Sequence, residues 1–268
     1  MRVAYFDCIA GITGETVLAA LIDAGVDLAD IRKHLGTLEL DPFELEVEAV
    51  EERGLHASRL AVRTHTSDVI RTFSSVRALL DAGELPTEAH HLAHRTLRLL
   101  AEAEARVHRR EPENVTFSDV GGLDTIVLVV GTAVGLTSLG VERIFSSAVP
   151  TGLGMTRTEH GALPIPTPTV LELLRGAPIF SRGVAAELTN ATGAAILAAT
   201  VEGYGELPTM RVEAIGYGAG SQRLDFPNLF RILIGHDEPV SSRPSLPGTP
   251  DLHLVTEPTP AREPGDAG

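Results

Sequence analysis

The sequence predicts an α/β fold, with a mixed sheet and helices packed around it. Segments with strand and helix patterns follow one another along the chain, but not in the strict strand–helix alternation that builds a fully parallel sheet. Hydrophobic residues make up 43% of the 268 residues, whereas aromatic residues make up only 4% and Trp is absent. The core is therefore expected to consist mainly of Leu, Val, Ile and Ala side chains.

The N-terminal part of the chain begins with an expected strand at residues 2–6, followed by a glycine loop and a helix at residues 15–24. A second helix is expected at residues 27–35. Residues 43–51 alternate apolar side chains with glutamates, as a half-buried strand does, and residues 55–63 fit as the hairpin partner.

A helical segment is expected at about residues 72–110, because residues 87–108 place apolar side chains on one face of a long helix. The elements expected after it are a short extended segment at 114–120, an apolar helix at 124–139, a strand at 141–149, a loop rich in Gly and Pro at 150–168, helices at 169–174 and 192–202, and strands at 211–217 and 228–234 around a glycine loop at 216–220.

Residues 1–236 are expected to fold as one domain. Residues 237–268 are rich in Pro, Ser, Thr, Gly and acidic residues and contain very little that could be buried, so they are expected to form a disordered tail. No internal repeat is visible in either part.

Composition and charge exclude several classes of protein. A formal net charge of −14 argues against a general nucleic-acid binder, which needs a basic face. A single cysteine rules out an intrachain disulfide, and the N-terminus shows no signal peptide. The best apolar segment is too short for the roughly 20 residues of a spanning helix, so no membrane partner is expected. The expected location is the cytoplasm.

The first candidate site is the end of the first strand, at Asp7 and Cys8, with Gly11 and Gly14 in the loop that follows. A strand that ends in a glycine loop before a helix can bind an anion, because free N–H groups point outward there. Cys8 and Asp7 add one soft and one hard potential metal ligand. The alternative is that Cys8 is a small buried apolar residue and that the glycines only make the turn.

Three further segments carry candidate residues. Asp119 and Asp124 flank a pair of glycines, although Asp124 also stands where a helix N-cap belongs. His160 lies in the long Gly- and Pro-rich loop, where a histidine can be a ligand, a general base or a scaffold residue. Thr192 and Gly193 begin a helix and could offer N–H groups to an anion.

Taken together, these segments resemble the nickel-insertion proteins of the LarC family, which complete the nickel-pincer cofactor of lactate racemase. The matching stretches occur in the same order along nearly the whole expected domain. They include Phe6-Asp7-Cys8 with Gly11 and Gly14, Ala101-Glu102-Ala103-Glu104-Ala105, Val120-Gly121 with Asp124, His160-Gly161 with Leu163-Pro164, Glu187-Leu188-Thr189, Thr192-Gly193-Ala194-Ala195, and Ile215-Gly216-Tyr217-Gly218-Ala219-Gly220.

The resemblance implies CTP-dependent insertion of Ni²⁺ into pyridinium-3,5-bisthiocarboxylic acid mononucleotide, a cyclometallase-type lyase reaction. Its product holds nickel through two sulfurs and a ring carbon. Cys and His suit such a borderline-soft ion, and glycine-loop N–H groups can bind the phosphate. The residues expected to handle the metal are Asp7, Cys8, Asp119, Asp124 and His160, and those expected to bind the substrate phosphate are Gly11, Gly14, Thr192 and Gly193.

The chain also departs from the family pattern. The family usually has Asp at the positions of Glu15 and Leu128, His at those of Thr116 and Ser118, and His-His at Val69-Ile70. Full-length members carry a C-terminal CTP-binding portion, which the expected tail replaces here. We therefore expect a truncated, diverged member that receives CTP only through a missing C-terminal part or a partner chain, with oligomerisation left open. The alternative is a non-catalytic metal- or nucleotide-binding module that has lost insertion activity.

Overall fold

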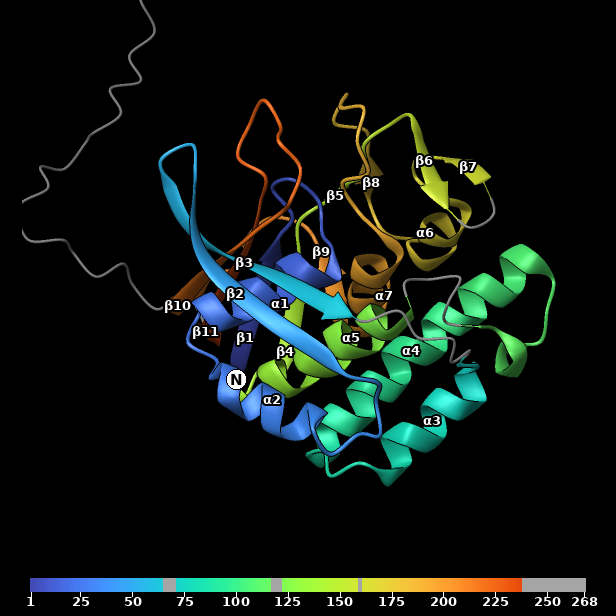
Figure 1. Cartoon of the computed structure of the whole chain (residues 1–268). Helices are drawn as coiled ribbons and strands as arrows, with labels where there is room; N and C mark the ends of the chain where they lie inside the picture. Colours follow the sequence, from blue (N-terminus) through green and yellow to red (C-terminus); the bar gives the residue numbers. More distant parts are fainter. Residues whose placement is uncertain (65–70, 117–121, 159–160, 238–268) are drawn as a thin grey trace, which may run out of the picture. The chain divides into compact units, whose positions relative to one another are not determined.

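The computed structural model describes residues 1–64, 71–116, 122–158 and 161–237 (Figure 1). These residues belong to one unit, Met1–Glu238. The expected tail at residues 237–268 lies outside the described residues, except for Asp237, which is the last residue of a strand. No helix in the described ranges is long and apolar enough to cross a membrane.

The centre of the fold is a mixed sheet, which confirms the predicted fold class. Within the described residues, it contains seven strands in the order β2 (Phe43–Glu52), β3 (Leu55–Thr64), β10 (Met210–Ala219), β11 (Leu229–Asp237), β1 (Arg2–Asp7), β4 (Arg143–Ser146) and β9 (Val201–Tyr204). Among the described strands, the first, β1, pairs antiparallel with the last, β11, and parallel with β4. Strands far apart in the sequence therefore lie side by side.

Helices cover one side of this sheet in successive layers (Figure 1). Helix α1 packs on β10 and β3, α5 packs on α1, α4 packs on α5 and α7, and α3 packs on α4. The helical elements in the described ranges are α1 (Gly14–Asp23), α2 (Leu28–Leu35), α3 (Phe73–Ala82), α4 (Thr87–His108), the short 3₁₀ helix η1 (Pro112–Asn114), α5 (Gly122–Ser138), α6 (Pro168–Leu173) and α7 (Ala191–Thr200).

The core lies between the sheet and these helices, and aliphatic side chains make up most of it, as the composition predicts. One aromatic contact sits at its centre, where the rings of Phe6 and Phe230 meet edge to face with centroids 5.3 Å apart. Helix α5 is buried along nearly its whole length, which agrees with its uniformly apolar sequence.

The structure differs from the expected elements at three places. The expected loop at residues 150–168 contains a short hairpin, β6 (Met155–Thr158) and β7 (Gly161–Pro164), and Val149–Pro150 (β5) pairs with Ile179–Phe180 (β8). Strands β6, β7 and β8 have at most four residues and contain no buried residue, and the two buried residues of β5 are too few to show an apolar alternation. The helix expected to reach residue 202 ends at Thr200, where the edge strand β9 begins.

The third difference is the expected glycine loop at residues 216–220, because Gly216 and Gly218 lie inside strand β10. Both glycines face α1. A Cβ atom at Gly218 would stand 1.8 Å from the backbone oxygen of Thr16, and one at Gly216 would stand 1.9 Å from that of Ala20. The glycines are therefore needed because the helix backbone touches the strand, and not because the chain turns.

Candidate functional site

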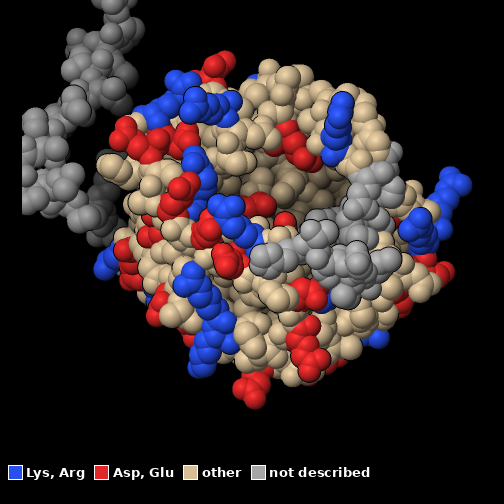
Figure 2. All heavy atoms as spheres, in the orientation of Figure 1, with Lys and Arg blue, Asp and Glu red and all other residues tan. Residues whose placement is uncertain are grey.

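Two adjoining pockets lie around the starts of α1, α5 and α7. The first has a volume of about 360 Å³ and lies between the loop after β1, the start of α1, strand β3 and the turn between β10 and β11. The second has a volume of about 260 Å³ and lies between α4, α5, α6 and the β6–β7 hairpin. Figure 2 shows a face of the molecule that is hollowed near its centre, with acidic and basic side chains at the rim.

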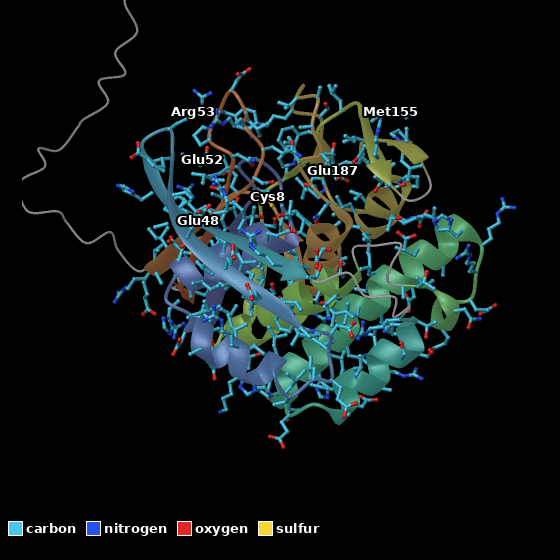
Figure 3. The ribbon with its side chains drawn as sticks, in the orientation of Figure 1. Cys8, Glu48, Glu52, Arg53, Met155 and Glu187 are labelled. Carbon is cyan, nitrogen blue, oxygen red and sulfur yellow. The ribbon has the colours of Figure 1, made fainter. Side chains whose placement is uncertain are left out.

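The two pockets share one wall, formed by Glu15, Asp124, Glu187 and Asn190. Glu15 lies in the first turn of α1, Asp124 lies in the first turn of α5, and Asn190 caps α7. Glu187, labelled in Figure 3, lies in the segment that leads into α7. Three helix starts thus converge on the same wall. The positive ends of helix dipoles favour carboxylates at these positions.

The carboxylates of this wall are only partly solvated. Burial raises the pKa of Asp124, and the nearby charge of Glu15 raises it further. Burial also raises the pKa of Glu187, while a hydrogen bond with Thr156 partly opposes that shift. Half-buried carboxylates that repel each other attract a cation, which would relieve both the repulsion and the poor solvation.

The described residues contain no group of three or more His, Cys, Asp or Glu side chains arranged to hold a metal ion.

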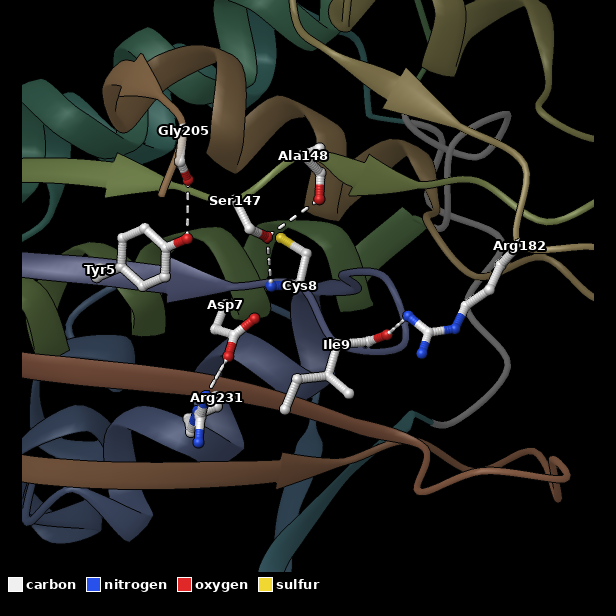
Figure 4. Close-up of polar contacts among 9 residues, drawn as sticks. All are labelled: Tyr5, Asp7, Cys8, Ile9, Ser147, Ala148, Arg182, Gly205 and Arg231. Atoms are coloured by element: carbon white, nitrogen blue, oxygen red, sulfur yellow. Dashed lines mark hydrogen bonds and ion pairs between the residues drawn. The ribbon is translucent and has the colours of Figure 1, made fainter. Parts of the chain in front are cut away.

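Asp7 and Cys8 lie outside both pockets, at the end of β1 (Figure 4). Asp7 Oδ2 pairs with Arg231 on β11, with Nη2 at 2.5 Å and Nε at 3.0 Å. The Cys8 side chain is 2% exposed, and its sulfur lies 3.6 Å from Ser146 Oγ. Burial raises the pKa of Cys8 to about 12, so the side chain is a thiol at neutral pH, whereas metals bind the thiolate.

The glycines predicted to bind a phosphate either donate their N–H groups to other atoms of the chain or pack closely against a neighbouring side chain. The Gly11 N–H donates to the Cys8 carbonyl at 3.2 Å, and the Gly193 N–H donates to Asn190 Oδ1 at 2.8 Å. A Cβ atom at Gly14 would stand 2.7 Å from Cγ2 of Thr192. These residues pack the start of α1 against α7.

The structure brings only some of the predicted site residues together. Gly11 and Asp124 line the first pocket, and Asp124 and Thr192 line the second. Gly14 and Gly193 are buried beside them. Asp119 and His160 lie outside the described residues.

Sequence reasoning alone does not select Arg59, Glu104 or His108, although all three line a pocket. Arg59 stands in an alternating strand, where an arginine usually marks the solvent side. Glu104 is 6% exposed and accepts a 2.6 Å hydrogen bond from Thr169 Oγ1, while its second oxygen lies 3.2 Å from His108 Nε2. A buried carboxylate of this kind has no local sequence signal except its position on the apolar face of α4.

Comparison with known proteins assigns the chain to one family. The family model described as "Nickel insertion protein" matches residues 4–249. A putative nickel insertion protein of Wolinella succinogenes is 41% identical over 249 residues, which cover 91% of this chain and 62% of the relative. The pyridinium-3,5-bisthiocarboxylic acid mononucleotide nickel insertion protein of Desulfitobacterium hafniense is 38% identical over 235 residues, which cover 88% of this chain and 58% of the relative.

The protein of the same name from Geobacillus kaustophilus is 38% identical over 258 residues, which cover 92% of this chain and 63% of the relative. The chain thus spans about three fifths of the length of these curated relatives. No solved structure matches it significantly. The family model covers most of the folded unit, including every element that forms the two pockets. The chain therefore belongs to the nickel insertion protein family.

Proposed function

We propose that the chain works in nickel-pincer cofactor assembly, by inserting Ni²⁺ into pyridinium-3,5-bisthiocarboxylic acid mononucleotide. The observation that carries this proposal is the acidic wall of Glu15, Asp124 and Glu187 between two adjoining pockets. The two pockets together offer room for a nucleotide-sized ligand, and the carboxylates of the wall can bind a cation beside it.

The chemistry of the product explains why a partial set of protein ligands is sufficient. The substrate itself supplies two sulfurs and a ring carbon to the nickel ion. The ring C–H bond breaks, its electron pair forms the carbon–nickel bond, and the proton leaves to a base, so nickel remains Ni²⁺. The protein only has to hold the ion until these donors replace its own carboxylates, and weak oxygen ligands exchange more readily than thiolates.

We further propose that CTP acts through the two fifths of the relatives' length that this chain does not span, or through a separate chain that carries it. Both described pockets lie within the region shared with the relatives, and their acidic wall disfavours a triphosphate. Asp119 and His160 remain predicted nickel-handling residues, and so do Asp7 and Cys8.

The test combines nickel binding with nickel insertion. Equilibrium dialysis at micromolar Ni²⁺ measures binding, and activation of apo lactate racemase after incubation with precursor, Ni²⁺ and CTP measures insertion. The Asp124→Asn variant is expected to lower both by about tenfold or more, because it removes a charge from the wall. Asp30→Asn is the matched control, since Asp30 also lies in a first helical turn but outside both pockets.

The insertion assay is run with the chain alone and with the separately supplied C-terminal part of the Desulfitobacterium hafniense relative. Activity that appears only in the mixture supports the half-protein form of the proposal. Nickel binding without insertion in either case points to the alternative, a metal-binding module. Absence of both binding and insertion contradicts the proposed function.

A further inference from the structure

We propose that Arg59 binds the phosphate group of a pyridinium mononucleotide in the first pocket. The identity of this ligand rests on the proposed function, while the anion subsite itself rests on the geometry around Arg59. Of the described residues that line this pocket, Arg59 is the one with a positive charge. Its guanidinium group has a planar set of five donors that suits phosphate oxygens.

The guanidinium of Arg59 is held in place by ion pairs, but one of its nitrogens makes no hydrogen bond to a described residue. Two glutamates of the neighbouring strand β2, both labelled in Figure 3, bind it. Glu48 Oε1 lies 3.2 Å from Nη1, and Glu52 Oε1 lies 2.9 Å from Nη2. The Nε atom is buried and has no hydrogen-bond partner among the described residues. A buried donor without a partner is costly, so an anion that turns the group and engages Nε would be bound favourably.

One of the two glutamates is easily displaced. The side chain of Glu48 is 64% exposed, whereas that of Glu52 is only 20% exposed. An exposed ion pair contributes little, and Glu48 regains full hydration when it swings away. A phosphate can therefore replace Glu48, while Glu52 continues to orient the guanidinium.

Three glycine N–H groups near the pocket are engaged already. The N–H groups of Gly11 and Gly193 donate within the chain, and the N–H of Gly220 donates to the Asn228 carbonyl at 2.9 Å. The glycine loop after β1 therefore offers an incoming phosphate less than its sequence pattern suggests. Arg59 is the stronger anion ligand of this pocket because it carries a full charge.

The charges of the pocket also indicate which class of ligand it takes. The same pocket holds Arg59 and the carboxylates Glu15, Asp124 and Glu187. A simple anion would be repelled by the acidic wall, and a simple cation would gain nothing from Arg59. A pyridinium mononucleotide can offer its phosphate to Arg59, while a nickel ion would lie between its anionic thiocarboxylates and the acidic wall.

The test compares two probes by isothermal titration calorimetry, nicotinate mononucleotide and nicotinate riboside, which differ only in the phosphate group. The Arg59→Gln variant is expected to weaken mononucleotide binding about tenfold or more and to leave riboside binding unchanged. Arg63→Gln is the matched control. Arg63 lies on the same strand and pairs with Glu46 at 2.6 Å, but it lines neither pocket, so both affinities should stay at the wild-type values.

A second variant distinguishes loss of the phosphate contact from misfolding of the protein. Glu48→Gln removes the competing carboxylate and is expected to tighten mononucleotide binding severalfold, a gain that a damaged protein would not show. The assignment is overturned if Arg59→Gln weakens the binding of both probes equally, or if Arg63→Gln weakens mononucleotide binding as much as Arg59→Gln does. It is also overturned if the wild-type chain does not bind the mononucleotide at millimolar concentration. Failure of nickel insertion with phosphate-dependent binding intact contradicts only the proposed function.

Discussion

Burial controls the chemistry of the side chains near the end of β1. The thiol of Cys8 is enclosed beside Ser146, and the phenol of Tyr204 is shielded as well, so burial raises the pKa of each to about 12. Asp7, one residue before Cys8, has an arginine partner instead. Two adjacent residues that look alike as potential ligands therefore differ in what they can do. Asp7 is a paired carboxylate, and Cys8 is a protonated thiol in a closed space.

The reactivity of Cys8 tests this difference. Because the chain has a single cysteine, alkylation by iodoacetamide reports on Cys8 alone. At pH 8 the folded protein is expected to react far more slowly than the protein in urea, since both burial and protonation protect the sulfur. Rapid alkylation of the folded protein would contradict a closed site. A nickel–thiolate absorbance band that is lost in Cys8→Ala would support the predicted role of Cys8 as a metal ligand.

The same pKa shift predicts a pH dependence of stability. The folded thiol keeps its proton up to about pH 12, whereas an ordinary cysteine loses it near 9.0, so the unfolded state binds fewer protons between these values. The stability contributed by the thiol is fully present below the lower value and is lost as the pH rises toward the upper one. Between them, the unfolding free energy should fall by about 1.4 kcal/mol per pH unit more steeply in the wild type than in Cys8→Ala. Parallel slopes in urea titrations would contradict the shift.

At the scale of elements, close contact between backbones distinguishes this fold. Helix α1 lies so near strand β10 that only hydrogen atoms fit on the strand face at Gly216 and Gly218. On its other side, α1 meets α5, where a Cβ atom at Gly131 would stand 2.8 Å from Leu18 Cδ2. The loop after β1 leads into the start of α1, and Glu15 lies in the first turn of that helix; both line the first pocket. Its fit between sheet and helix therefore determines where the pocket walls stand.

Adding one methyl group on this face tests the importance of the contact. Gly218→Ala is expected to lower the unfolding free energy by roughly 1–3 kcal/mol, because the new Cβ forces α1 away from the strand. Gly205→Ala is the control, since a Cβ there would meet nothing within 4 Å. Chemical denaturation of the two variants gives the comparison. An equal effect of both substitutions would contradict a steric origin at Gly218.

For the molecule as a whole, the sequence predicts the local elements far better than the site. Helices such as α2 and α4 agree with the expected ranges nearly to the residue, because caps and apolar spacing are local signals. Asp124 could be found because it lies near a helix start, although α5 begins at Gly122 and Asp124 is therefore not the expected N-cap. Arg59 reaches the pocket only because β3, β10, β11 and β1 are neighbours in the sheet. Glu187 reaches it because its segment bridges to Gly152, and no local pattern encodes either pairing. The protonation state of Cys8 likewise depends on β4, which is far away in the sequence.

The pairing of β1 with β11 has a consequence for how the protein is made. Tyr5 stands opposite Leu233, so β1 leaves the ribosome long before β11 and meets this antiparallel neighbour only after nearly all of the described chain has been translated. Until then, that edge of β1 presents unpaired N–H and C=O groups and a row of apolar side chains. Such long-range pairing is slow to form and prone to aggregation, so the nascent chain has a long period in which a chaperone would protect it.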